Sequence, residues 1–162
     1  MTTKVRIETN KGTIMAELWP EAVINTVKNF VELARNGYYD GVTFHRVVPD
    51  FVVQGGDPTG TGGGGPGYAI ACETDGPKQE HLLGALSMAH AGRDTGGSQF
   101  FIVLNPDNCK HLNRKHTVFG GVVEGFDVVQ SIRQGDKMIK VEVLEADYDV
   151  DSHELKKLPS RR

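Results

Sequence analysis

The sequence contains no long apolar run and only two cysteines. No stretch approaches the roughly 18 consecutive apolar residues that a membrane-spanning helix requires, and the residues after Met1 form no hydrophobic signal segment. We therefore expect a cytoplasmic protein that does not insert into membranes. Cys72 and Cys109 lie far apart in the sequence, and neither has cysteine or histidine neighbours at zinc-finger spacing. Reduced thiols and no disulfide are therefore expected.

An excess of one charge is also missing. Lysine and arginine number 18 against 21 aspartates and glutamates, which gives a formal net charge of −3. This balance gives no electrostatic reason to expect nucleic acid or an anionic membrane as a partner. Proline is scarcer than glycine, at 7 against 20 residues, and this composition favours a turn-rich, mainly β protein. A single domain of 162 residues can be stable on its own core without a disulfide or metal.

Apolar periodicity predicts mostly strands, with two helices. Alternating apolar and polar residues predict a β-hairpin over residues 4–18, and helical spacing predicts a helix between Val23 and Ala34. A second, short helix is expected over residues 126–132, before Gly135. With the other apolar runs the chain has about eight strands, a number that favours closure of the sheet into a barrel because open edges are a liability.

The sequence changes character near its C-terminal end. Ile139, Val141 and Val143 alternate with polar residues, which predicts a last strand. Beyond this strand the chain is polar, with acidic residues followed by basic ones. We therefore place the domain at residues 1–146 and expect residues 147–162 to form a polar C-terminal tail that is solvated or loosely docked.

The segment at residues 44–57 combines apolar residues with one cation. It reads F-H-R-V-V-P-D-F-V-V-Q-G-G-D, so Arg46 stands among valines and phenylalanines and Gln54 follows eight residues later. Arg46 could simply lay its aliphatic stem over apolar surface with its head in water. Alternatively, it could be a fixed cationic donor at the edge of an apolar pocket, with Gln54 holding the guanidinium from behind.

Three other sequence features could indicate a phosphate-binding loop, a hydrolase nucleophile or a metal site, but the residues around each argue against it. The glycine-rich run at residues 57–67 lacks the Gly-Lys-Ser/Thr sequence of a phosphate-binding loop, so a mobile surface loop is expected there. Ser98 does not lie in a Gly-x-Ser-x-Gly elbow, which argues against a hydrolase nucleophile. The six histidines are scattered, with His111 and His116 five positions apart, and no metal site is expected.

Four motifs occur in order along nearly the whole chain. They are F-H-R-V-V-P-D-F-V-V-Q-G-G-D at 44–57, L-S-M-A-H-A-G at 86–92, T-G-G-S-Q-F-F-I at 95–102 and H-T-V-F-G at 116–120. In these motifs the sequence resembles the cyclophilin family of peptidyl-prolyl cis-trans isomerases, in particular its small single-domain microbial members. The resemblance implies a mainly β fold, a closed eight-stranded antiparallel β-barrel capped by two α-helices, with a substrate groove on its outer face and no cofactor.

The resemblance also implies the residues of the site. Arg46 takes the place of the catalytic arginine and Gln54 that of the glutamine beside it, and Phe51 and His116 complete the catalytic set. The residues implied to bind the substrate are Val52, Met88, Ala89, His90, Ala91, Gln99, Phe101, His111 and Leu112. Within the two sets, the implied lining of the proline pocket is Phe51, Val52, Phe101, Leu112 and His116.

The sequence departs from the family pattern at three positions. Val52 replaces a frequent methionine, and His90 replaces a common asparagine at a position that the resemblance suggests works through its backbone. His111 stands where cyclosporin-sensitive members carry a tryptophan. Loss of a large indole and its N–H donor implies reduced affinity for cyclosporin.

The resemblance predicts an enzyme that speeds rotation about X–Pro peptide bonds and so assists protein folding. Its expected partners are proline-containing peptides and unfolded or partly folded proteins, and it is expected to act as a monomer. The alternative is a proline-peptide binding module or chaperone that uses the same groove without turnover. Because binding alone would not require a buried guanidinium with a supporting amide, Arg46 and Gln54 favour the enzyme.

Overall fold

The chain begins with the β-hairpin that its alternating pattern predicts. The computed structural model describes residues 3–160, and in it β1 (Thr3–Thr9) and β2 (Gly12–Leu18) pair antiparallel. Val5 lies opposite Ala16 in this hairpin, and both side chains are buried in the core. The residues between these buried positions face outward, as period-two alternation requires.

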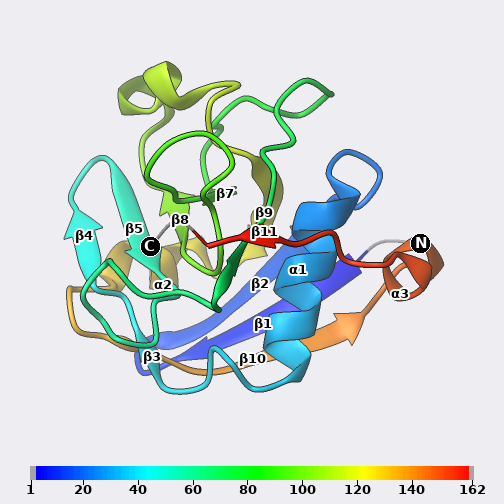
Figure 1. The fold of residues 1–162 in the computed structure, drawn as a ribbon. Helices are drawn as coiled ribbons and strands as arrows, with labels where there is room; N and C mark the ends of the chain where they lie inside the picture. Colours follow the sequence, from blue (N-terminus) through cyan, green and yellow to red (C-terminus); the bar gives the residue numbers. More distant parts are fainter. Residues whose placement is uncertain (1–2, 161–162) are drawn as a thin grey trace.

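This hairpin lies inside a nine-stranded antiparallel sheet, and Figure 1 shows how strongly the sheet curls. The strand order is β3-β10-β1-β2-β9-β7-β8-β5-β4. Its other strands are β3 (Val42–Thr43), β4 (Arg46–Val48), β5 (Val52–Gly55), β7 (Ala85–Met88), β8 (Phe100–Val103), β9 (Val118–Glu124) and β10 (Lys137–Glu145). A separate small sheet pairs β6 (Tyr68–Ala69) with β11 (Leu158–Pro159).

The two edge strands of the main sheet, β3 and β4, follow each other in the sequence but do not pair with each other. We call the boundary between them the seam. β3 ends at Thr43 and β4 begins at Arg46, and no ladder joins these two strands in the described part of the chain. The backbone of β5 also approaches this seam, because a Cβ on Gly55 would lie 3.0 Å from the carbonyl oxygen of Thr43.

The mainly β antiparallel class expected from the sequence is confirmed, but the closed eight-stranded barrel is wrong in two details. The sheet has nine strands and is open. The physical reason is that β3 and β4 are only two and three residues long. The segment between them instead bonds to the loop before β10, where the amide of Phe44 donates to the carbonyl of Asp136 at 2.7 Å.

Two helices cover the sheet where the sequence predicts them. α1 (Ile24–Arg35) inserts Phe30 into the curled sheet, where its ring centroid lies 5.4 Å from that of Phe100 and 5.4 Å from that of Phe119. α2 (Phe126–Ser131) buries Val129.

Three shorter helices were not predicted. They are η1 (Pro106–Asn108), η2 (Lys110–Leu112) and α3 (Tyr148–Ser152). No helix within residues 3–160 has the length and apolar character needed to cross a membrane.

The alternation predicted for the last strand is interrupted by a β-bulge. Thr9 pairs with Met138 and Glu8 with Lys140, so Ile139 has no opposite residue on β1. Met138 is fully buried and Ile139 is 55% exposed. A bulge adds one residue to one strand and changes the face on which the following side chains lie, which is why Ile139 faces solvent although its spacing from Val141 matches a strand.

The C-terminal tail is held against α1, contrary to the expectation of a solvated or loosely docked segment. The side chain of Asn25 donates to the carbonyl of Lys156 at 3.0 Å and accepts from its amide at 2.8 Å. Val150 of α3 is fully buried, and Arg35 bonds to Asp151 at 2.7 Å. Figure 1 shows the tail crossing in front of α1 to reach β6. The division of the chain at residue 146 stays a prediction.

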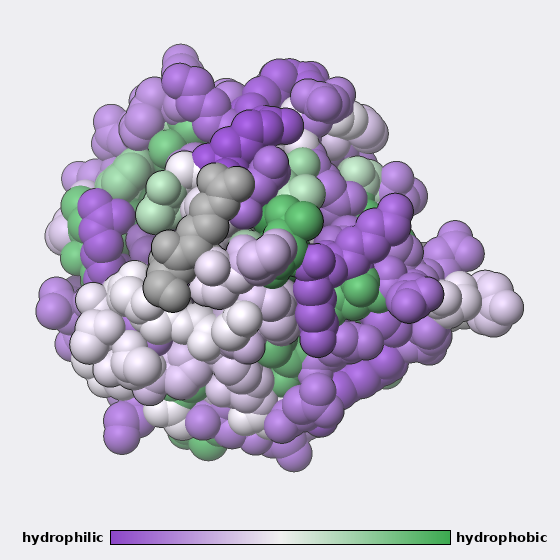
Figure 2. All heavy atoms as spheres, viewed as in Figure 1, coloured by the Kyte–Doolittle hydropathy of each residue, from purple (hydrophilic) through white to green (hydrophobic). Residues whose placement is uncertain are grey.

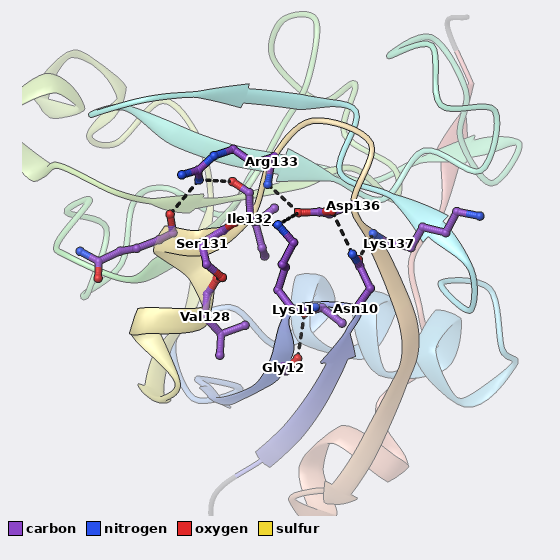
Figure 3. A network of polar contacts seen from close by, with 11 residues as sticks. Asn10, Lys11, Gly12, Val128, Ser131, Ile132, Arg133, Asp136 and Lys137 are labelled. Atoms are coloured by element: carbon purple, nitrogen blue, oxygen red, sulfur yellow. Dashed lines mark hydrogen bonds and ion pairs between the residues drawn. The ribbon is translucent and has the colours of Figure 1, made fainter.

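A polar network fixes the backbone next to the seam (Figure 3). The carboxylate of Asp136 accepts from the Asn10 side chain at 2.9 Å and from the Arg133 amide at 2.7 Å, and the Lys11 ammonium lies 3.3 Å away. These contacts, led by the Asn10 hydrogen bond, lower the pKa of the Asp136 carboxyl. Because the Asp136 carbonyl accepts from Phe44, the network ties the hairpin turn and the loop before β10 to the seam.

We predict that Asp136→Asn destabilises the fold by about 1 kcal/mol at pH 7, the typical net contribution of a lost hydrogen bond. Because folding lowers the pKa of this carboxyl, the carboxylate stabilises the fold fully at pH values above its unfolded-state pKa of about 3.9. The contribution is lost as the pH falls through the folded pKa. Urea unfolding of both proteins at pH 7 and pH 3 measures the difference, which should shrink at pH 3. An equal difference at both pH values would contradict a role for the charge.

Candidate active site

A groove of about 520 Å³ lies on the outer side of the curled sheet. Its walls come from β4 and β5, β8, the loop after β7, η2 and the glycine-rich loop. The lining residues are His45, Arg46, Phe51, Val52, Gln54, Thr61, Gly62, Ala89, His90, Ala91, Gln99, Phe101 and Leu112. The structure thus brings together, in one groove, most of the site residues that the sequence predicts.

Three predicted residues lie behind or beside this lining. Met88 is buried, and its carbonyl bonds to the His116 ring at 2.8 Å. The His116 ring in turn lies edge-on to Phe101, with centroids 5.7 Å apart. His111 is exposed and stacks on Phe51 at 5.9 Å, so it extends the apolar wall at the rim.

Strand register places the main groove residues in one row. Arg46 lies directly opposite Gln54 across β4 and β5, and Gln54 lies opposite Phe101 across β5 and β8. Directly opposite residues point to the same face of a sheet. The neighbouring pair, Val53 and Ile102, points the other way and belongs to the interior core. The eight-residue spacing of Arg46 and Gln54 is therefore the consequence of a short hairpin that folds back on itself.

The Arg46 guanidinium lies at the rim of the groove. Its Nη1 donates to Gln54 Oε1 at 3.4 Å, and its central carbon lies 5.8 Å from the centroid of the Phe51 ring. Arg46 as a whole is exposed, so the expected buried guanidinium is wrong for the free protein. Arg46 lines the groove together with Phe101, and the reading of Arg46 as a cationic donor at the edge of an apolar pocket stays a prediction.

The floor of the groove is apolar and supported from behind. Val52 and Phe101 are nearly fully buried, and they pack in a second apolar cluster with Cys109. His81 stacks flat on Phe101, at 5.7 Å and 10°, and its Nε2 bonds to Ser87 at 2.8 Å. Burial lowers the pKa of His81 to about 4, so a neutral ring supports Phe101 near pH 7.

Two histidines meet at one end of the groove. His90 and His116 stack with ring centroids 3.9 Å apart and planes 4° from parallel. Because the Met88 carbonyl can only accept, Nδ1 of His116 carries the proton of the hydrogen bond between them. Burial lowers the pKa of His116, and the bond to Met88 opposes this effect only in part. His116 thus supports the lining residues His90 and Phe101 from beside the groove.

Sequence reasoning missed the contribution of the glycine-rich loop. Thr61 and Gly62 line the groove, and Figure 2 shows a pale surface of intermediate hydropathy where this loop lies. Far from being loosely attached, the loop bonds repeatedly to the fully buried carboxylate of Asp57. The signal was present, because an aspartate followed by Thr and Gly residues is typical of a turn that closes on its own side chain.

His45 was also missed as a lining residue. Its Nδ1 is buried and has no hydrogen-bond partner in the structure, and burial lowers the pKa of this histidine. Within the described part of the chain, no three His, Cys, Asp or Glu side chains gather as metal ligands do.

Comparisons with known proteins agree with this geometry. The family model of the cyclophilin type peptidyl-prolyl cis-trans isomerases matches residues 4–150. Peptidyl-prolyl cis-trans isomerase B of Bacillus subtilis is 60% identical over 127 residues, which cover 78% of this chain and 87% of that protein. A peptidyl-prolyl cis-trans isomerase of Synechococcus elongatus is 52% identical over 145 residues, which cover 88% of this chain and 97% of that protein.

Solved structures give the same result. The crystal structure of a cyclophilin type isomerase from Cryptosporidium parvum superposes with a TM-score of 0.81 at 30% identity, covering 91% of this chain and all of that one. The chain therefore belongs to the cyclophilin family. The activity that goes with this membership is peptidyl-prolyl cis-trans isomerisation, so the protein is an isomerase enzyme.

We predict that kcat/KM changes less than twofold between pH 6 and pH 9. Rotation about the X–Pro bond moves no proton, and an arginine keeps its charge throughout this range. Burial also lowers the pKa values of His45, His81 and His116. A coupled cis/trans assay on a short X–Pro peptide, run in steps of half a pH unit, measures the profile. A bell-shaped profile would contradict this prediction and indicate acid–base work by His116.

Proposed function

We propose that the groove holds the substrate proline against Phe101 and Leu112, and that Arg46 is the catalytic residue. The observation that carries this proposal is the row formed by Arg46, Gln54 and Phe101. It places a cationic donor, an acceptor that orients the donor, and an apolar floor next to one another. We infer that an X–Pro group bound on this floor lies with its imide nitrogen on the side of the guanidinium.

The reaction needs no bond to break. Rotation about a peptide bond has a barrier of about 18–20 kcal/mol, because the nitrogen lone pair is delocalised into the carbonyl. In the twisted state that lone pair is localised on nitrogen and can accept a hydrogen bond. A donor that reaches this nitrogen binds the twisted imide better than the planar one, and such differential binding is what accelerates a reaction. Arg46 is positioned to be that donor.

The magnitude requires a second contribution. One preorganised donor supplies about 2.7–4 kcal/mol, whereas even modest enzymes lower the barrier by about 8 kcal/mol. The planar imide is the more charge-separated form, so the apolar walls around Phe101 and Leu112 disfavour it relative to the twisted form. Together, a donor at the rim and a dry floor account for catalysis better than either does alone.

We propose the remaining features of the function together with this catalytic role. The substrates are proline-containing peptides and unfolded or partly folded proteins, and the protein acts as a cytoplasmic monomer that also assists folding as a chaperone. Support for the peptide substrates comes from a second crystal structure of the Cryptosporidium parvum isomerase, which was determined in the presence of the dipeptide Ala-Pro. A proline-peptide binding module without turnover is the second candidate, and the cis/trans assay distinguishes the two.

We predict that Arg46→Ala lowers kcat by about 100-fold or more, because each tenfold loss corresponds to about 1.36 kcal/mol. Arg46→Lys should recover only a small part, since an ammonium keeps the charge but loses the planar fork. Arg93→Ala is the matched control, because Arg93 is an exposed arginine outside the groove lining. Near-normal turnover in Arg46→Ala would contradict the catalytic role.

We also predict that His111→Trp increases inhibition by cyclosporin by about tenfold or more, while isomerase activity on a short peptide changes less than threefold. His111 is exposed and stacks on Phe51 at the rim, so an indole fits there without displacing core residues and adds an N–H donor. Inhibition curves for both proteins measure the change. Equal sensitivity would show that this position does not control the affinity for the drug.

A further inference from the structure

The buried carboxylate of Asp57 organises the glycine-rich loop at the edge of the groove. Its Oδ2 accepts from three backbone amides, those of Thr61 at 3.1 Å, Gly62 at 2.7 Å and Gly64 at 3.0 Å. Its Oδ1 accepts from the amide of Thr59 at 2.8 Å. Burial alone would raise the pKa of this carboxyl, but the hydrogen bonds, led by that of Gly64, lower it well below its ordinary value. The carboxylate is therefore held in its charged form.

The same two glycines bond to the active site through their carbonyls. The side-chain amide of Gln99 donates to the carbonyl of Gly62 at 2.9 Å and to that of Gly64 at 3.1 Å. With its NH₂ group engaged in this way, Gln99 presents its oxygen to Gln54, whose Nε2 donates to it at 3.2 Å. Gln54 in turn presents its own oxygen to Arg46 at 3.4 Å. Gln99 is only 4% exposed, so water has little access to replace these bonds.

The loop carbonyls determine whether each glutamine amide turns its donor end or its acceptor end toward the next residue. A glutamine amide has a donor end and an acceptor end. If the loop carbonyls moved away from Gln99, its amide could rotate and offer an NH₂ group to Gln54. Gln54 would then offer an NH₂ group to the guanidinium, and two donors would face each other. The orientation that favours Arg46 thus depends on carbonyls that Asp57 holds in place.

We propose that Asp57 is a positioning residue for the isomerase reaction, acting on Arg46 through Gly62 and Gly64, Gln99 and Gln54. Asp57 does not touch the substrate, and this inference rests on the proposed catalytic role of Arg46. A carboxylate that only shaped the groove wall at Thr61 and Gly62 would affect KM at least as much as kcat. A positioning carboxylate affects kcat more than KM, because the donor is required in the twisted state.

Two neighbouring glycines provide a matched test. Neither Gly64 nor Gly65 has a positive φ, so alanine fits either backbone. A Cβ on Gly64 would lie 2.0 Å from Oδ1 of Asp57, whereas a Cβ on Gly65 meets no atom within 4 Å. We expect Gly64→Ala to lower kcat about tenfold with KM changed less than threefold. Gly65→Ala should leave both parameters within twofold of the parent enzyme.

A double-mutant cycle tests whether Asp57 affects kcat through Gln99. Asp57→Asn places an NH₂ group against backbone amides on at least one side, and we expect it to lower kcat about tenfold. In a Gln99→Ala background the same change should lower kcat less than twofold, because the amide chain is already broken. If the two substitutions acted independently, their fold-reductions in kcat would multiply in the double variant. That result would overturn the proposed route. Thermal unfolding of every variant identifies any that do not fold.

Arg46→Ala, measured in the same series, separates this inference from the proposed function. If Arg46→Ala keeps its turnover, the catalytic role fails and the positioning role fails with it. If Arg46→Ala loses turnover while Gly64→Ala behaves as Gly65→Ala does, only the positioning role is overturned. The glycine pair decides the question even if Asp57→Asn does not fold, since both substitutions lie in a surface loop outside the hydrophobic core.

Discussion

The register of three antiparallel strands is the constraint on which the groove depends. Backbone pairing of β4, β5 and β8 puts Arg46, Gln54 and Phe101 in one row. Because side chains alternate between the two faces of a strand, a slip of one residue would send that row into the core and bring its apolar neighbours out. The relative positions of donor, orienting amide and apolar floor are therefore set by the backbone. Side-chain contacts only refine them.

The interior of the fold protects this register. Val53 and Ile102 pack in the core directly behind the groove residues. Phe44, two residues before Arg46, is fully buried and bonds through its amide to Asp136. The seam network around Asp136 thus fixes the point at which the chain enters β4. An edge strand of three residues could not hold its own register, so these anchors supply the precision that its length does not.

The sequence predicts the groove better than it predicts the fold's irregularities. Arg46 and Gln54 could be recognised because a hairpin converts their spacing into opposition across two strands. The bulge at Ile139 has no local signal, since its neighbours alternate as in a regular strand. The docking of the tail depends on Asn25, which lies far away in the sequence. The exposure of Arg46 in the free protein depends on tertiary packing, which motif reasoning does not describe.

Because Arg46 is exposed, its proposed catalytic role depends on the orientation of the guanidinium more than on its charge. Ordering a long side chain costs up to about 1.5–2 kcal/mol of rotamer entropy, which is about half of what a single preorganised donor returns. A guanidinium that had to be ordered anew in every turnover would therefore lose much of its benefit. Gln54, which is itself held by Gln99, bonds to Arg46 in the free protein. Part of the rotamer entropy of Arg46 is therefore lost before the substrate binds. The half-buried Gln54 and the buried Gln99 behind it thus support the proposed role of Arg46 as an oriented donor although its side chain contacts water.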